Sequence, residues 1–505
     1  MTNGIEAKLA RLATGAAPRV LDLFSGCGGM ALGFSKAGCQ SLGGVELDAD
    51  AARSFATNFH RGLPDALFEE HAKPKDITAT DPVALLSALG HDRPRAVVDF
   101  LVGGPPCPTF TRVGRAKLRE VQQHPEAFRH DPRAQLYVPY LRFVKELSPV
   151  ALVMENVPDF LNWGGHNLAE EICEVLEGLG YRCAYTLLNA ANYGVPQMRD
   201  RFFLIAIHKL AGVPVRFPTP THEVDLPPGY EGSRDVALKH IRELSLFSPK
   251  LRYVASPSVS WGAPPALTVA EAIADLPPIT GHLDGSIRRG ARRFNECTTY
   301  RQDAVPSAYA RLMREFPGFG GDGRIWDHVI RSLSDRDYRL FRHMQHGDEY
   351  PEAHALAVKL FEAERHRLRR ARANFNEDAL HKAFVPPYDP AKFPNKWRKM
   401  EPDKPSRTLM AHLGKDSYSH IHYDSEQARV LSVREAARLQ SFPDGFRFCG
   451  TMNPAFRQIG NAVPPLMAFA LAATIRETLR ERVVSGTVAR ERRPRYGRQL
   501  VAEKA

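Results

Sequence analysis

Short apolar runs alternate regularly with amphipathic segments between residue 19 and about residue 208, and this alternation constrains the fold most. The runs VLDLFSG, SLGGVELD, AVVDFLVGG and PVALVMENV predict strands, and the stretches between them predict helices. Strands that alternate with helices predict a doubly wound α/β domain with a largely parallel sheet. Two further strands, YTLLNA and RFFLIAIH, end this part, which we assign to residues 18–210.

The rest of the chain has a different residue pattern. Residues 211–430 are rich in proline and arginine and show no βα alternation, which predicts a separate, loop-rich second domain. Within it, residues 365–372 predict a helix with a basic face, or equally an ordinary solvated helix. Residues 431–485 are regular again: Ser432 and Glu435 predict a capping box, QIGNAVPP a loop, and a long helix follows to about residue 484. The basic tail at 486–505 predicts disorder.

The net charge and the cysteine content limit the classes of function that the chain can have. The formal net charge is +11, which favours a polyanionic partner, with nucleic acid ahead of a membrane surface, although a merely basic surface fits too. Seven scattered cysteines show no zinc spacing, so we expect no metal site and a reduced, cytoplasmic chain. The N-terminal residues lack the apolar core of a signal peptide, and no apolar run is long enough to span a bilayer.

The first candidate site is the glycine-rich turn in DLFSGCGG. Gly26, Gly28 and Gly29 would let the backbone approach a nucleotide-like ligand, and Glu46 at the end of the next strand could accept both ribose hydroxyls. The GxGxxG spacing of dinucleotide sites is absent, so a nucleoside cofactor without a pyrophosphate fits better. A tight turn that needs glycine is the simpler alternative.

The second candidate is the cysteine in GGPPCPTF. Cys107 follows a predicted strand and is held between Pro106 and Pro108. Because ligands bind at the carboxyl ends of strands in open α/β sheets, a thiol fixed there is well placed as a nucleophile. A cysteine in this position could otherwise be a small buried hydrophobe.

Charged residues mark two more strand ends. Glu155 ends the apolar strand PVALVM, where a carboxylate is costly unless it is paired or takes part in chemistry. Arg199 and Arg201 alternate into the strand RFFLIAI and should share one face, where they could stabilise anions. A carboxylate satisfied by a helix N-terminus and a structural ion pair are the alternatives.

Taken in order, DLFSGCGG, GVELD, GGPPCP, MENV, QMRDR, REAARLQSFPD and QIGNAVPP resemble the motif set of the cytosine-C5 DNA methyltransferases. The resemblance covers residues 19–207 and 396–480. It implies a Rossmann-like domain that uses S-adenosylmethionine, with a variable region that selects the target in double-stranded DNA. It further implies a prokaryotic modification enzyme, which we expect to act as a monomer, with or without a separate restriction endonuclease.

The resemblance also implies residue roles. Cys107 would attack C6 of a flipped-out cytosine, Glu155 would act at N3, and Arg199 and Arg201 would hold the base. The residues implied at the cofactor are Phe24, Cys27, Gly29, Glu46, Asp76, Pro106, Leu136, Asn461 and Val463. REAARLQSFPD is expected to be mainly structural.

The segment after Cys107 is long and basic, which predicts a lid over DNA. Arg112, Arg115 and Lys117 are its candidate phosphate contacts. The family usually reads PCQxFS here, whereas this chain has Pro108 and Thr111, which puts the lid's DNA contacts in doubt. Two other functions stay open. One is methylation of tRNA, which the large middle region disfavours because the tRNA-modifying branch of the family is compact there. The other is a nucleic-acid-binding regulator with an inactive catalytic domain, which would be expected to lack Cys107 or Glu155, whereas both are present.

Overall fold

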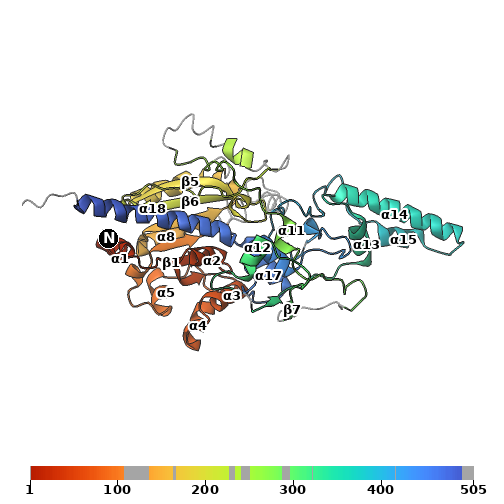
Figure 1. The fold of residues 1–505 in the computed structure, drawn as a ribbon, viewed down its shortest axis with the longest axis horizontal. Helices are drawn as coiled ribbons and strands as arrows, with labels where there is room; N and C mark the ends of the chain where they lie inside the picture. The colour runs from red at the N-terminus through yellow and green to blue at the C-terminus, as the bar shows by residue number, and fades with distance from the viewer. Residues whose placement is uncertain are drawn as a thin grey trace, which may run out of the picture.

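The computed structural model describes residues 2–106, 136–162, 167–226, 234–239, 241, 251–286, 296–320, 322–415 and 417–491. A six-stranded sheet lies at its centre, in the order β2-β1-β3-β4-β6-β5 (Figure 1). The strands are β1 (Arg19–Leu23), β2 (Gln40–Val45), β3 (Phe100–Gly103), β4 (Ala151–Asn156), β5 (Tyr181–Asn189) and β6 (Asp200–His208). The first four are parallel, and β6 is antiparallel to both β4 and β5. The predicted α/β fold is therefore confirmed.

Helices cover both faces of the sheet because alternate strand residues point to opposite sides. Val20, Phe100 and Val153 pack on one face, and Leu21, Leu101 and Leu152 on the other. The first face is covered by α2 (Gly29–Lys36) and α18 (Pro465–Glu491), and the second by α5 (Pro82–Ala88), α8 (Tyr137–Leu147) and α9 (Leu168–Gly178). Since β2 and β3 lie on opposite sides of β1, the strand order reverses at the carboxyl end of β1, where such sheets form a crevice.

The two ends of the chain meet where α18 lies on α2. A Cβ on Gly33 would lie 2.5 Å from the Cβ of Ala468, the backbone nitrogen of Phe469 and the carbonyl oxygen of Pro465. The two helices therefore approach backbone to backbone, and only glycine fits at position 33 of α2.

Replacing Gly33 with alanine should lower the free energy of unfolding by about 1–3 kcal/mol, because the added methyl group forces the two helix backbones apart. Urea unfolding would measure the change. Gly178→Ala is the matched control, since a Cβ there meets nothing within 4 Å. Equal stabilities of the two variants would contradict the close packing.

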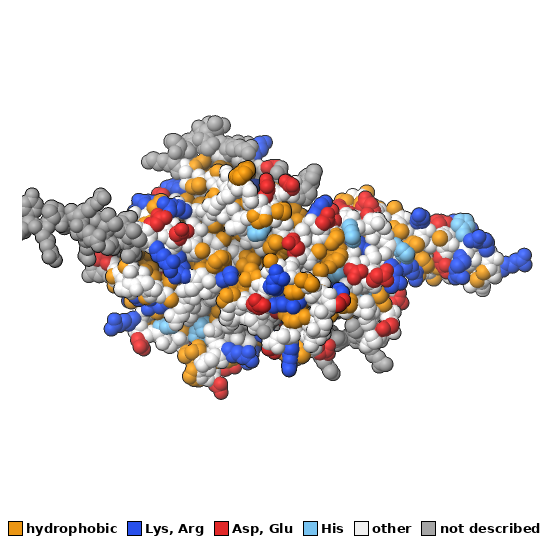
Figure 2. All heavy atoms as spheres, viewed as in Figure 1, with side chains coloured by type: hydrophobic (Ala, Val, Ile, Leu, Met, Phe, Trp, Pro, Cys, Tyr) orange, Lys and Arg blue, Asp and Glu red, His pale blue; other side chains and the backbone are white. Residues whose placement is uncertain are grey.

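The middle region has two parts. Helix α11 (Val269–Ile273), helix α12 (Ala308–Arg314) and strand β8 (Arg324–Trp326) contribute to the same hydrophobic core as the sheet. Other residues between 333 and 430 form a separate core, around Trp397, Phe341 and Tyr350. From this core α14 (Tyr350–Arg370) and α15 (Glu377–Phe384) extend away from the sheet, next to α13 (Asp335–His343) (Figure 1). Figure 2 shows basic side chains at the far end of this extension. The domain boundaries stay a prediction.

Three expectations about the C-terminal segments need correction. Residues 458–461 are not loop, because α17 (Met452–Asn461) includes them, and Gly460 fits in that helix against the carbonyl of Met410. Helix α18 continues to Glu491, so the first residues of the expected tail are helical, and residues 492–505 lie outside the described chain. The stretch Met452–Glu481 is apolar and long enough to cross a membrane by composition, contrary to expectation. However, 67% of its most apolar window is buried and α18 covers the sheet, which is typical of a core helix.

Candidate active site

A cavity of about 850 Å³ opens at the carboxyl edge of the parallel strands. Its walls come from the turn after β1, the ends of β2 and β4, and the Pro105–Pro106 turn after β3. Further walls include residues 409–411 of the middle region and the turn between α17 and α18. The cavity therefore joins segments from the beginning, middle and end of the chain.

Glu46 is fixed at one end of the cavity. Its two carboxylate oxygens accept hydrogen bonds from the backbone N–H groups of Gly26, at 2.9 Å, and Asp48, at 2.8 Å. Burial raises the pKa of Glu46, and these two hydrogen bonds partly oppose that rise. The glycine-rich turn thus orients the carboxylate, and its remaining lone pairs can accept hydroxyl groups of a ligand.

The predicted cofactor residues occupy different parts of this cavity. Eight of the nine line it: Phe24, Gly29, Glu46, Asp76, Pro106, Leu136, Asn461 and Val463. Phe24 has a left-handed backbone, with φ of 55°, at the tight turn out of β1. Cys27 is not among the lining residues, because its side chain is fully buried and its Sγ faces the carbonyl of Gln458. The carboxylate of Asp76 accepts hydrogen bonds from Thr78.

Glu155 and Arg201 form an ion pair at the other end of the cavity. The Nε of Arg201 lies 3.0 Å from Oε1 of Glu155, and each side chain is 13% exposed. Burial raises the pKa of Glu155, while the guanidinium groups of Arg201 and Arg199 limit that rise. A Cβ on Gly104 would lie 2.7 Å from Oε2 of Glu155, so glycine makes room for the carboxyl group after β3.

Arg199 also lines the cavity, but its guanidinium group donates hydrogen bonds to backbone carbonyl groups. It donates to Leu409 at 2.9 Å, to Gly460 at 2.8 Å and to Ala462 at 3.3 Å, and the side chain is buried. Arg199 and Arg201 therefore reach the same cavity, as their alternation predicts. The structure adds that Arg199 ties residue 409 of the middle region to the α17–α18 turn.

Cys107 and the proposed lid residues Thr111, Arg112, Arg115 and Lys117 lie outside the described residues. The turn that leads to Cys107 is described and is held in place. The side-chain amide of Asn156 donates to the carbonyl of Pro105 at 3.1 Å, which links the ends of β3 and β4. Pro106, the residue before Cys107, lines the cavity together with Glu155.

Sequence reasoning missed several residues of the cavity. Asp22 is 2% exposed, accepts a hydrogen bond from the N–H of Ala31, and has its pKa raised well above the ordinary value by burial. A lone carboxylate inside an apolar strand is the same signal that singled out Glu155. Arg457 pairs with Asp48 at 2.7 Å at the rim of the cavity. No sequence signal could have found that pair, because the partners are 409 positions apart.

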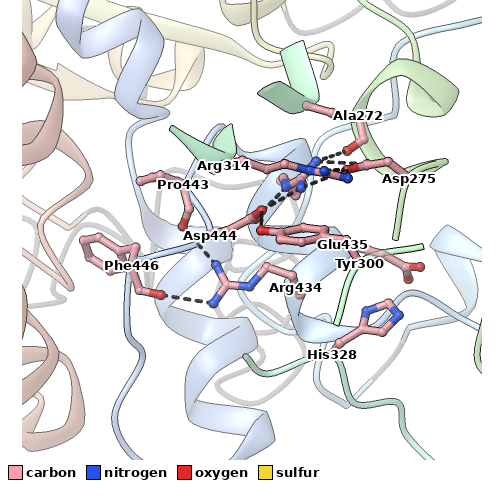
Figure 3. A network of polar contacts seen from close by, with 12 residues as sticks. Ala272, Asp275, Tyr300, Arg314, His328, Arg434, Glu435, Pro443, Asp444 and Phe446 are labelled. Carbon is pink, nitrogen blue, oxygen red and sulfur yellow. Dashed lines mark hydrogen bonds and ion pairs between the residues drawn. The ribbon is translucent and has the colours of Figure 1, made fainter. Parts of the chain in front are cut away.

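Buried arginines of α16 (Val433–Leu439) hold the middle region beside this site. The guanidinium of Arg438 binds Asp444 twice at 2.6 Å and Asp275 at 3.2 and 3.3 Å. Tyr300 donates to Asp444, and Arg314 pairs with Asp275 (Figure 3). The residues of the REAARLQSFPD motif do not line the cavity, which supports the structural role expected for it.

The capping box predicted for this helix is confirmed. Ser432 accepts from the N–H of Glu435, whose carboxylate accepts from the N–H of Ser432 in return. The same carboxylate binds Arg429 twice at 2.7 Å, in full burial. Arg434 donates to the carbonyl groups of Pro443 and Phe446, which closes the turn after the helix (Figure 3).

Comparison with solved structures agrees with this fold. The crystal structure of a DNA modification methyltransferase encoded within a prophage, from E. coli, superimposes with a TM-score of 0.58 at 22% identity. The match covers 92% of this chain and 99% of that one. At this identity the likeness concerns the fold alone.

Comparison with sequences shows the family. A chain from Oceanobacillus iheyensis named as a type II methyltransferase, M.OihORF3336P, is 36% identical over 92% of this chain and 96% of its own length. The type II methyltransferase M.AgeI of Thalassovita gelatinovora is 31% identical over 91% of this chain and 99% of its own length. The sequence profile of the C-5 cytosine-specific DNA methylases matches residues 18–477. The chain therefore belongs to the C-5 cytosine-specific DNA methylase family and is a DNA cytosine methyltransferase.

Proposed function

We propose that this protein transfers a methyl group from S-adenosylmethionine to C5 of a flipped-out cytosine in duplex DNA, through a covalent bond between Cys107 and C6. The observation that carries the proposal is that one cavity is lined by both Glu46 and Glu155. Glu46 lies at one end, and Glu155 lies at the other, beside the turn that leads to Cys107. Glu46 follows β2 and Glu155 lies near the end of β4, and these two strands are three strand spacings of about 4.8 Å apart, or roughly 14 Å.

The residues at the Glu46 end fit an adenosine. Glu46 presents an oriented carboxylate for the ribose hydroxyls, and Asp76 lies in the same wall for the adenine amino group. Gly29, Asn461 and Val463 would close the pocket, and Pro106 and Leu136 would lie near the methionine side. Cys27, whose side chain is buried away from the cavity, could contribute only through its backbone. When bound, S-adenosylmethionine supplies an electrophilic methyl group.

The residues at the Glu155 end fit the cytosine ring. Glu155, whose pKa is raised by burial, would donate a hydrogen bond or its proton to N3, which makes C6 electrophilic. The Cys107 thiolate would then add to C6, and the electron pair displaced to C5 would take up the methyl group, with S-adenosylhomocysteine as the leaving thioether. Loss of the C5 proton to water would re-form the double bond and expel the thiolate, and N3 would return to Glu155 any proton that it had received. Arg201 holds Glu155 in place through its ion pair.

A base inside a duplex cannot reach such a site, so the cytosine must leave the helix, at a cost of a few kcal/mol. Residues 211–430 would then read the surrounding sequence, with residues 431–485 completing the catalytic domain. Thr111, Arg112, Arg115 and Lys117 remain our candidates for contacts to DNA. The relatives named as type II methyltransferases favour a cytoplasmic modification enzyme of a restriction system, acting as a monomer.

The experiment that tests this function is methyl transfer from labelled S-adenosylmethionine to duplex DNA and, separately, to tRNA, with each product digested to nucleosides. The Cys107→Ser variant, which lacks the proposed nucleophile, serves as the negative control. We expect label in 5-methyldeoxycytidine with the wild type and none with the variant. Label only in a ribonucleoside would replace DNA with RNA as the substrate, and DNA binding without label would favour a regulator.

A further inference from the structure

Beyond Phe361, the extension formed by α14 and α15 adds no buried residue to the core from which it projects. The last buried residue of α14 is Phe361, and α15 has no buried residue. Nine residues of α14 follow Phe361, which at 1.5 Å per residue is about 14 Å of helix beyond the core. Phe361 contacts the ring of His381, and Leu380 and Phe384 of α15 are only partly buried against the core. The stability of the fold therefore gives little reason for this length.

Five arginines gather at the end of this extension, and we name them the basic tip: Arg365, Arg367, Arg369, Arg370 and Arg372. Three of them are paired: Arg365 and Arg369 with Glu377, and Arg367 with Glu364. Among the residues that the structure describes, Arg370 and Arg372 are exposed and have no acidic partner. Figure 2 shows this end of the molecule as strongly basic.

The backbone at Arg372 is a second, independent observation. Helix α14 ends in a Schellman motif: Ala373 N–H donates to the carbonyl of Leu368, and Arg372 N–H to that of Arg369. Arg372 occupies the left-handed position of this motif, with φ of 53°. Glycine is the usual residue there because a side chain makes this conformation costly. A favourable interaction with the helix dipole accounts for basic residues in the last turn, but Arg372 lies after the helix has ended.

We propose that the basic tip binds backbone phosphates of duplex DNA outside the target sequence. This inference rests on the proposed function, since it extends the binding surface of the same enzyme along its substrate. Charge complementarity selects the partner, because exposed arginines donate to phosphate oxygens in a forked geometry. A lipid surface fits less well, because no large apolar side chain is exposed between residues 365 and 372.

The test compares the wild type with a tip variant, Arg370→Gln/Arg372→Gly. Affinity is measured by fluorescence anisotropy on duplexes of about 12 to 40 base pairs centred on the target, at several salt concentrations. The target itself comes from bisulfite sequencing of plasmid DNA methylated by the wild type. Arg93→Gln/Arg95→Gln is the control, because it removes the same charge from exposed positions at α6 (Pro94–Val97), which precedes the amino end of β3; Arg95 pairs there with the exposed Glu146.

We expect the tip variant to bind the long duplexes several-fold more weakly than the wild type and the short duplexes equally well. On the long duplexes, the slope of log affinity against log salt concentration should shrink by about 0.9 for each phosphate that the variant no longer neutralises. Its melting temperature should equal or exceed that of the wild type, because glycine relieves the left-handed position. Equal affinities and salt slopes on long duplexes would overturn the proposal, as would an equal loss of affinity in the control variant. A loss of the same size on short duplexes would place the tip at the target and also overturn it. Absence of methylation by the wild type would instead count against the proposed function.

Discussion

Replacing Glu155 with glutamine should lower the turnover of methyl transfer to DNA by about 10²- to 10⁴-fold. Glutamine keeps the shape of the side chain but cannot deliver a proton to N3. It also removes the negative partner of Arg201, whose Nε lies 3.0 Å from the carboxylate. Single-turnover methylation of duplex DNA at saturating S-adenosylmethionine measures the chemical step without product release.

The pH dependence identifies the group responsible. Since the pKa of Glu155 is raised by burial, its protonated form persists to higher pH than in an ordinary glutamate. The wild-type rate should therefore fall as pH rises through that raised pKa. This alkaline limb of the pH–rate profile should be missing in the glutamine variant.

Glu170→Gln is the matched control for this experiment. Glu170 lies on α9 and pairs with Arg252 at 2.8 Å with 15% of its side chain exposed, so it resembles Glu155 in burial and partner but does not line the cavity. A Glu155→Gln enzyme within tenfold of the wild type, or one that keeps the alkaline limb, would contradict the role of Glu155.

Replacing Arg438 with methionine should lower the free energy of unfolding by about 3–5 kcal/mol. The side chain has no exposure, and its removal leaves Asp444 and Asp275 buried without its guanidinium group. Arg314 would still pair with Asp275, and Tyr300 would still donate a hydrogen bond to Asp444. Neither residue replaces the ion pair that Arg438 makes with the buried Asp444. Urea unfolding at neutral pH measures the decrease in stability.

Arg314→Met provides the comparison. Arg314 pairs with the same Asp275, but its side chain is 21% exposed, so its removal should cost much less than that of Arg438. Since Arg438 does not line the cavity, the folded Arg438→Met protein should retain methyl transfer within a few-fold of the wild type. Similar losses of stability in the two variants would show that the buried network does not hold the middle region as described.

The α/β fold and the ends of its strands could be predicted because both depend on local sequence. Buried parallel strands require apolar runs, and a polar residue at the end of such a run is costly unless it serves a site. This reasoning found Glu46 and Glu155, and the structure places both at one cavity. The same reasoning, applied to the strand VLDLFSG, would also have found Asp22. The antiparallel placement of β6 between β4 and β5 was not specified by the apolar pattern, which is the same for either direction.

Residues that meet across the fold could not be predicted in the same way. Arg199 looked like a ligand-binding group, yet its guanidinium binds carbonyl groups more than 200 positions away. The Asp48–Arg457 pair and the contact between Gly33 and α18 also join the two ends of the chain. Such contacts leave no local pattern, because each partner alone resembles an ordinary surface charge or a flexible glycine.

The sequence by itself determined the fold class, the family and the residue types at the carboxyl edge of the sheet. The physical reason is that strand periodicity, glycine turns and buried charges are local constraints. Only the tertiary structure decided that the guanidinium groups of Arg199 and Arg438 hold distant segments together, and that α14 projects a basic tip beyond its core. Those outcomes depend on packing and desolvation, which are set when distant segments are brought together.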